Sequence, residues 1–188
     1  MKALLLSGGL ESCALAYWLR PPVAITIDYG QLPAEGEIRA SAAICAELGV
    51  EHVVVRSDAY FEAPPEGKKG AVWWPYRNQL LITLAAIRLH EQGLSELNIG
   101  LVKGDVFKDC GQKFVGAVTD LMLLQEGRIL VRAPAIGLTA IELLKVSGIP
   151  ADFLGITMSC HVMDIPCGQC AGCRKNSATR RAYLASAT

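Results

Sequence analysis

The sequence has little charge of either sign and no long apolar run. Charged residues make up 19% of its 188 residues, and because Lys+Arg and Asp+Glu both total 18, the formal net charge is zero. No global field therefore attracts nucleic acid or an anionic membrane. No uninterrupted apolar run reaches the about 18 residues of a membrane span, and the first run meets Ser7 too early for the core of a signal peptide. We expect a cytoplasmic protein of ordinary domain size.

The first loop lacks the lysine of the G-x-x-x-x-G-K-[ST] motif and does not fit G-x-G-x-x-G. An apolar run over 2–6 ends instead at Ser7-Gly8-Gly9-Leu10-Glu11-Ser12, and Ser12 is expected to open a helix over 13–19. Both glycines permit positive φ and close approach of backbone amides to an anion, and the helix N-terminus adds its dipole. The alternative is an ordinary strand–helix turn. A phosphate bound here would need Mg²⁺ or basic residues from elsewhere in the chain.

Strand-like and helical segments alternate, which predicts an α/β fold with a Rossmann-like, doubly wound, mainly parallel sheet. Further strands are expected over 23–27, 53–55, 97–102 and 129–131. Helices are expected over 34–48, ended by Gly49, over 78–92, with Asn78 as N-cap and Leu80, Leu81, Leu84 and Ile87 on one face, over 112–125, and from a Thr139 cap to Gly148. The Pro- and Gly-containing stretch 57–72 is expected to be a loop. A knuckle and a final helix with Arg174, Lys175, Arg180 and Arg181 complete the chain.

Seven cysteines form an odd number, which argues against a disulfide framework. Four of them follow the pattern Cys160-x6-Cys167-x2-Cys170-x2-Cys173, in which thiolates two residues apart can converge on one ion. Such a set completes a tetrahedral zinc shell with no open position, so we predict structural zinc. An iron–sulfur cluster and uncoordinated thiols are the alternatives. Cys13 and Cys45 are expected in the core.

Three further polar groups are expected at the carboxyl edge of the sheet, where ligands of such folds bind. Asp28-Tyr29-Gly30-Gln31 follows the second strand, although Asp28 and Gly30 can simply form a turn. Arg77-Asn78 follows an aromatic cluster, 73–76, that could stack a purine or serve as plain loop packing. Asp105 and Asp109 follow the fourth strand and can hold Mg²⁺ or a polar substrate, or be merely solvated.

In order and spacing, these motifs together with Asp109-Cys110 resemble the 7-cyano-7-deazaguanine synthases of the queuosine pathway, within the PP-loop ATP pyrophosphatase group. The resemblance covers nearly the whole chain. It implies a homodimeric zinc ligase that uses ATP and Mg²⁺ to adenylate the carboxylate of 7-carboxy-7-deazaguanine and combines it with ammonia to give the nitrile. It also implies a Rossmann-like ATP-binding region over 1–155 and a zinc-binding lobe over 156–188, packed on the same domain.

The resemblance implies roles for particular residues. The nucleotide and its phosphates would be bound by Ser7, Gly8, Gly9, Leu10, Glu11, Ser12, Asp28, Tyr29, Gly30 and Gln31. Catalysis would rest on Arg77, Asn78 and Asp109. The deazapurine would face Asp105, Asp109 and Cys110, and zinc would be bound by Cys160, Cys167, Cys170 and Cys173.

The chain departs from the family pattern at four places. Glu11 replaces Asp, Gly111 replaces Arg in a loop shortened by about two residues, Ala140 stands where a basic residue is expected, and His161 replaces Tyr. These changes keep other functions open. The chain can be a paralogue that joins the activated acyl group to another amine, on a protein or nucleic acid, or a non-catalytic nucleotide-binding protein. A sulfur-transfer enzyme is the weakest alternative.

Overall fold

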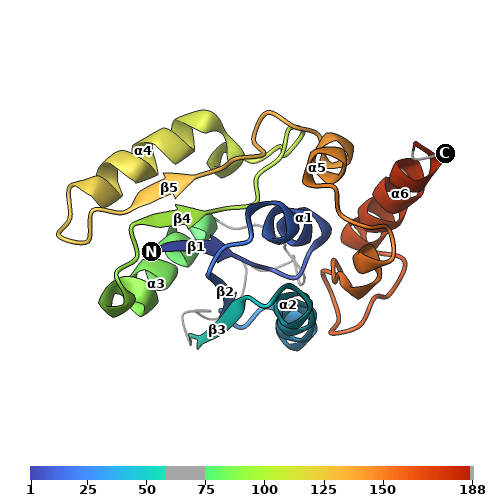
Figure 1. Ribbon diagram of the computed structural model, residues 1–188, viewed down its shortest axis with the longest axis horizontal. Helices are drawn as coiled ribbons and strands as arrows, with labels where there is room; N and C mark the ends of the chain where they lie inside the picture. The colour runs from blue at the N-terminus through green and yellow to red at the C-terminus, as the bar shows by residue number, and fades with distance from the viewer. Residues whose placement is uncertain (58–74, 187–188) are drawn as a thin grey trace.

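The computed structural model describes residues 1–57 and 75–186, and these form a parallel sheet covered by helices on both faces (Figure 1). The strands are β1 (Lys2–Leu5), β2 (Val23–Asp28), β3 (Glu51–Arg56), β4 (Glu96–Asn98) and β5 (Leu130–Arg132), in the spatial order β3-β2-β1-β4-β5. All four neighbouring pairs are parallel. The α/β, Rossmann-like fold predicted from the sequence is therefore confirmed.

Six α-helices and three 3₁₀ turns connect and cover these strands in the described part of the chain. The helices are α1 (Leu10–Leu19), α2 (Ala34–Leu48), α3 (Arg77–Leu89), α4 (Gln112–Leu123), α5 (Ala140–Ser147) and α6 (Ala171–Ala185). The 3₁₀ turns are η1 (His90–Gln92), η2 (Lys108–Cys110) and η3 (Phe153–Ile156). None of the helices in the described ranges has the length and apolar character to span a bilayer.

Two hydrophobic cores lie on opposite faces of the sheet. Side chains of α3 and α4 pack on one face, and those of α1, α2 and α5 pack on the other. Alternate residues of a strand point to opposite faces, so Ala3 belongs to the first core and Leu4 to the second. Cys13 and Cys45 are buried in the second core, as the sequence predicted.

The predicted ends of two helices are confirmed by their caps. Gly49 ends α2 in a left-handed conformation, with φ of 66°. Thr139 caps α5 through a capping box in which its side chain accepts a hydrogen bond from the amide of Glu142 and the Glu142 carboxylate accepts one from the amide of Thr139. Gly148 ends that helix, also in a left-handed conformation.

The predicted apolar face of the third helix is confirmed only in part, since Leu81 and Leu84 pack at the edge of the first core. α3 contacts the sheet through Ile82, Ala85, Ala86 and Leu89, whereas the side chain of Ile87 is 68% exposed. Two consecutive alanines let the helix approach the strands closely, which a pattern based on leucines alone does not indicate.

Several predicted boundaries also differ, and two of them bear on the site. The fourth strand ends at Asn98 rather than Val102, because the chain turns after Ile99, whose carbonyl accepts a hydrogen bond from Leu101 N–H. The first helix begins at Leu10 rather than after Ser12. The predicted loop over 57–72 falls almost entirely outside the described residues.

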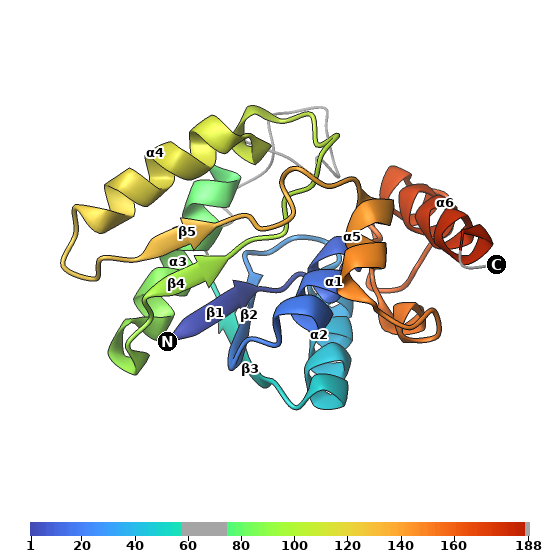
Figure 2. The same ribbon diagram turned by 45° about the horizontal axis from the view of Figure 1, so that its top comes forward.

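The C-terminal segment, residues 156–186, packs against the second core. The Tyr183 hydroxyl of α6 donates a hydrogen bond to the Ile149 carbonyl at 2.8 Å, and Figure 2 shows α6 beside α5. The segment also reaches the first loop, where Met158 N–H donates to the Gly8 carbonyl at 2.8 Å. These contacts place the C-terminal segment over the carboxyl end of β1.

Candidate active site and metal centre

The loop after β1 presents hydroxyl and amide groups to the carboxyl edge of the sheet. Ser7 Oγ and Ser12 Oγ lie 3.2 Å apart, and Ser12 Oγ donates to the Gly9 carbonyl at 3.0 Å. Gly9 is the N-cap of α1, and Cys13 is the first residue whose amide bonds back to it. The amides before Cys13 therefore have no acceptor within the helix and can serve an anion.

The two glycines of this loop have different roles. Gly8 has a φ of 71°, as predicted, and a Cβ added there would lie 2.8 Å from the Glu37 carbonyl oxygen of α2. Gly9 has a φ of −72°, so only Gly8 uses the positive φ that both glycines permit. Gly8 thus permits the close packing of the loop on α2, and Gly9 begins the helix.

A cavity of about 450 Å³ opens at this edge of the sheet. Its wall joins the first loop, the start of α3, the segment after β4 and the C-terminal segment. Residues that were predicted as functional and that line it are Ser7, Gly9, Leu10, Glu11, Ser12, Tyr29, Arg77, Asn78, Asp105, Cys110 and the zinc-ligand candidate Cys160. Gly8, Asp28, Gly30, Gln31 and Asp109 were also predicted as functional, but they do not line it.

Asp28 and Gln31 act on neighbouring protein groups. Asp28 Oδ1 accepts a hydrogen bond from Gly30 N–H at 2.9 Å, and Asp28 Oδ2 pairs with Arg56 at 2.8 Å. The Gln31 amide donates to Glu37 Oε2 at 2.9 Å. The turn alternative therefore describes Asp28 and Gly30, and Gln31 orients a carboxylate that does line the cavity.

That carboxylate, Glu37, is a cavity residue that the sequence reasoning missed. Burial raises its pKa to about 7, against the opposing effects of the Gln31 amide and the charge of Arg77. The signal that could have found it is its place six residues after Gln31, in the first turn of α2. A carboxyl group with this pKa can hold or release a proton near neutral pH.

Arg77 and Asn78 begin α3 and join it to the segment after β4. The Asn78 amide donates to the Asp109 carbonyl at 3.0 Å, and Arg77 donates to Asn78 Oδ1 at 3.2 Å. The predicted N-cap role of Asn78 is wrong, since Tyr76 occupies that position. Asn78 instead fixes Asp109 and Cys110, and Cys110 is a thiol whose pKa burial raises to about 11.

Lys175 of α6 is the second cavity residue that the sequence reasoning did not place. Its Nζ lies 2.7 Å from Glu11 Oε1 and 3.9 Å from Asp105 Oδ1. Burial opposes its charged form, but the acidic groups around it, Glu11 first and then Asp105, together raise the pKa of Lys175. The missing cation of the first loop was the only signal for it, because Glu11 and Lys175 are far apart in the sequence.

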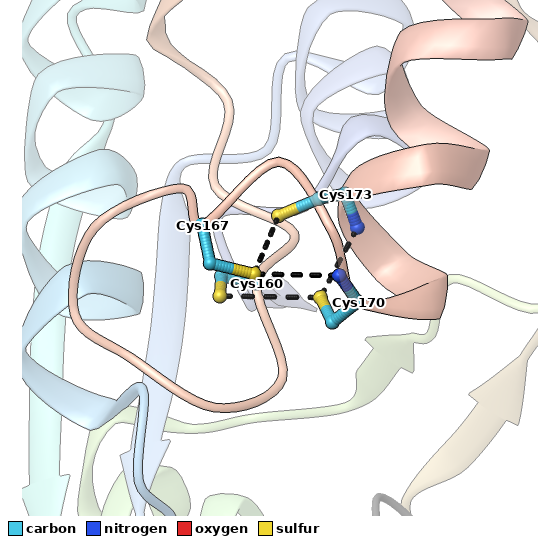
Figure 3. A group of neighbouring side chains, drawn as sticks. All are labelled: Cys160, Cys167, Cys170 and Cys173. Atoms are coloured by element: carbon cyan, nitrogen blue, oxygen red, sulfur yellow. Dashed lines mark hydrogen bonds between the residues drawn. The ribbon is translucent and has the colours of Figure 1, made fainter.

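The four C-terminal cysteines converge, and Figure 3 shows their sulfurs turned toward one another. All four Sγ atoms lie within 4.8 Å of one another, and the pairs Cys160–Cys170 and Cys167–Cys173 are 3.9 Å apart. A tetrahedral ion with sulfur ligands at 2.3 Å would place the sulfurs about 3.8 Å apart. The group can therefore hold a single metal ion.

The backbone around this group favours thiolates. Burial opposes ionisation, yet amides of Cys173 and His161 that donate to Cys170 Sγ lower its pKa to about 6. Burial and the neighbouring sulfurs raise the pKa of Cys173 to about 12. Four thiolates this close repel one another, and a divalent cation would offset that repulsion.

A family profile and similar curated proteins place this chain in the same family. The profile of the family described as "Queuosine biosynthesis protein QueC" matches residues 62–184. The 7-cyano-7-deazaguanine synthase of Campylobacter fetus is 24% identical over 194 residues, which cover 90% of this chain and 87% of that protein. The enzyme of the same name from Methanosarcina barkeri is 29% identical over 209 residues, covering 92% and 90%.

A solved structure shares the fold at lower identity. The U34-tRNA thiolase NcsA from Methanococcus maripaludis, described with its [4Fe-4S] cluster, superposes with a TM-score of 0.57 at 17% identity. The match covers 98% of this chain and 71% of that one.

Proposed function

Since this chain belongs to the QueC family of queuosine biosynthesis proteins, we propose that it is an ATP-dependent carbon–nitrogen ligase. Its substrate would be 7-carboxy-7-deazaguanine, its nitrogen donor ammonia, and its product 7-cyano-7-deazaguanine. The observation that carries the proposal is the 450 Å³ cavity, which combines an anion-binding loop with Arg77, Asn78 and Asp105. A volume of this size suits a small-molecule site.

In this proposal the first loop binds the phosphates of ATP. The Ser7 and Ser12 hydroxyls and the first amides of α1 are the donors, Glu11 is the carboxylate available to Mg²⁺, and Tyr29 faces the nucleotide. Magnesium would offset charge on the phosphates as pyrophosphate leaves. Gly9 and Leu10 line this pocket, Gly8 packs its loop on α2, and Gln31 holds Glu37. Asp28 and Gly30 form the turn after β2.

Arg77 would stabilise the negative charge that develops as the carboxylate attacks the α-phosphate. Asn78 would hold the η2 segment against the deazapurine through the Asp109 carbonyl. We assign base binding to Asp105 and Cys110, which line the cavity, with Asp109 beside them at the position that Asn78 holds. Glu37, with a pKa of about 7, is suited to take a proton from the incoming ammonia.

The balance of atoms sets the stoichiometry. A carboxylate has two oxygens and a nitrile has none, so both must leave. The carboxylate and one ATP give an acyl adenylate and pyrophosphate, and ammonia then gives the amide, AMP and a proton. A second ATP activates the amide oxygen, and loss of AMP and a proton leaves the nitrile. The proposal therefore requires two AMP and two pyrophosphate per nitrile.

We propose zinc for the four-cysteine group. Sulfurs 3.9 Å apart fit one tetrahedral ion. An iron–sulfur cluster places each thiolate on a different iron and so separates the sulfurs further. All four positions are protein ligands, so the site is structural and holds the 156–188 lobe over the 1–155 region. A homodimer is part of the proposal by family resemblance alone.

A second candidate is a ligase for a different amine. The observation that favours it is the loop over 107–111, which is shortened and has Gly111 in place of the arginine of the family pattern. Joining the acyl group to a protein or nucleic acid amine needs one ATP and gives one AMP. It yields no nitrile, so the AMP to nitrile ratio separates the two candidates.

The test is product analysis with metal-loaded protein, ATP and Mg²⁺, with and without 7-carboxy-7-deazaguanine and ammonia. The proposal predicts base-dependent AMP and pyrophosphate, with two AMP per nitrile. Base-dependent AMP that stalls in ammonia without nitrile would favour the second candidate. Absence of base-dependent ATP consumption would refute both. Arg77→Met should lower kcat by about 100-fold, whereas Arg88→Met, exposed at the end of the same helix, should not.

A further inference from the structure

The C-terminal lobe brings one cation to the phosphate loop. Lys175 lies on the second turn of α6, and its ammonium group bridges Glu11 of α1 and Asp105 of the segment after β4. Its side chain lines the cavity and keeps 55% of its surface exposed. The ammonium group is thus anchored at the mouth of the cavity and accessible to a ligand.

The loop itself cannot balance the charge of a polyphosphate. Its donors are hydroxyls and amides, which are neutral, and Glu11 adds a negative charge in the first turn of α1. A diphosphate group carries several negative charges, so Glu11 alone would repel it. The Lys175 ammonium group offsets Glu11 and lies on the cavity side of the loop.

We propose that Lys175 binds the leaving pyrophosphate part of ATP, and that Glu11 holds its ammonium group in place until the nucleotide arrives. On binding, the ammonium group exchanges the carboxylate for phosphate oxygens, and Glu11 is released toward the magnesium ion. ATP then bridges the first loop and the C-terminal lobe. The inference rests on the proposed function, because it takes ATP as the ligand.

A surface ion pair with no ligand role is the competing explanation. Exposed pairs contribute little to stability, so loss of Lys175 would then change neither stability nor binding greatly. A phosphate contact has a different signature. Loss of such a contact weakens the binding of ligands that carry the β- and γ-phosphates and leaves the binding of AMP, which lacks them, unchanged.

The experiment measures binding of ATP, inorganic pyrophosphate and AMP, each with Mg²⁺, to the metal-loaded protein by isothermal titration calorimetry. Lys175→Met should weaken the binding of ATP and of pyrophosphate by about tenfold or more, since a charge-assisted hydrogen bond is lost. AMP should stay within about twofold, and Lys175→Arg should restore part of the loss. Lys113→Met removes the same charge from an exposed position on α4 that does not line the cavity, and should match the wild type.

The outcomes separate this inference from the function on which it rests. Wild-type protein that binds no ATP would refute the proposed function. Wild-type binding with Lys175→Met binding pyrophosphate equally well would refute the inference and leave the function intact. Equal weakening of AMP and pyrophosphate would also refute it, since that pattern reports a general change of the pocket.

A second variant guards against misfolding of the first. Glu11→Gln removes the carboxylate that holds Lys175, so binding of pyrophosphate without Mg²⁺ should strengthen severalfold. The double variant Glu11→Gln with Lys175→Met should lose that gain. If Glu11→Gln left magnesium-free pyrophosphate binding unchanged, the exchange of partners would be refuted.

Discussion

Gly8 joins the first loop to α2, and its replacement by alanine tests that packing. The residue has a φ of 71°, which an alanine adopts at a cost of about 1–2 kcal/mol. The added Cβ would lie 2.8 Å from the Glu37 carbonyl oxygen and 2.9 Å from Ala40 Cβ. Both neighbours belong to a packed helix, so the backbone must shift.

The two costs can be separated with a matched control. Gly49 ends α2 with a φ of 66°, and a Cβ added there meets nothing within 4 Å. Gly49→Ala should therefore carry the conformational cost alone, about 1–2 kcal/mol. Forcing a methyl group into the packed contact at Gly8 adds about 1–3 kcal/mol. Gly8→Ala should thus lower the free energy of unfolding by about 2–5 kcal/mol in total.

Urea unfolding of the metal-loaded protein, followed by circular dichroism, gives both values. The difference between the variants should be about 1–3 kcal/mol, and Gly8→Ala should also weaken ATP binding because the loop moves away from α2. Equal losses for Gly8→Ala and Gly49→Ala would refute the packing argument, since the two positions share the conformational cost and differ only in the contact.

Three further predictions concern the four-cysteine group, the Glu37 carboxyl group and the Thr139 cap of α5. Mass spectrometry should find about one zinc per chain in the wild type and in Cys110→Ser, and none in Cys170→Ser, whose Tm should also fall. Zinc retained by Cys170→Ser would contradict the four-thiolate site. Burial raises the Glu37 pKa to about 7, so the folded state holds a proton that the unfolded state releases, and stability should fall as pH rises from about 4.5 to 7. Urea unfolding at pH 5 and pH 8 measures the fall in the free energy of unfolding, and Glu37→Gln should reduce that fall by up to about 3 kcal/mol. An unchanged pH dependence in this variant would refute the role of Glu37. Thr139→Ala should cost about 1 kcal/mol by opening the capping box, and Thr139→Ser almost nothing; equal unfolding midpoints for the two would contradict the cap.

The sequence predicted best those features that neighbouring residues determine. Gly49 and Thr139 mark helix ends because a left-handed residue and a side-chain cap act within one turn of chain. The cysteine knuckle is likewise local, since its four ligands fall within 14 residues, from Cys160 to Cys173. Spacing alone therefore indicated how these groups converge.

Features that depend on distant packing were missed. Lys175 meets Glu11 only because the C-terminal lobe docks on the first loop through the Met158–Gly8 hydrogen bond. Glu37 acquires its raised pKa from burial in the cavity wall. Asn78 was predicted as a helix cap, but its amide reaches the Asp109 carbonyl, a partner 31 residues away. No local pattern encodes such pairings.

The most direct test of the account follows oxygen atoms. Metal-loaded protein is given ATP, Mg²⁺, ammonia and 7-carboxy-7-deazaguanine labelled with ¹⁸O in both carboxylate oxygens, and the AMP is analysed by mass spectrometry. Adenylation of the substrate predicts that each AMP formed carries one ¹⁸O, with one equivalent from the carboxylate and one from the amide. AMP without ¹⁸O, released while the base is consumed, would contradict carboxylate activation in this cavity.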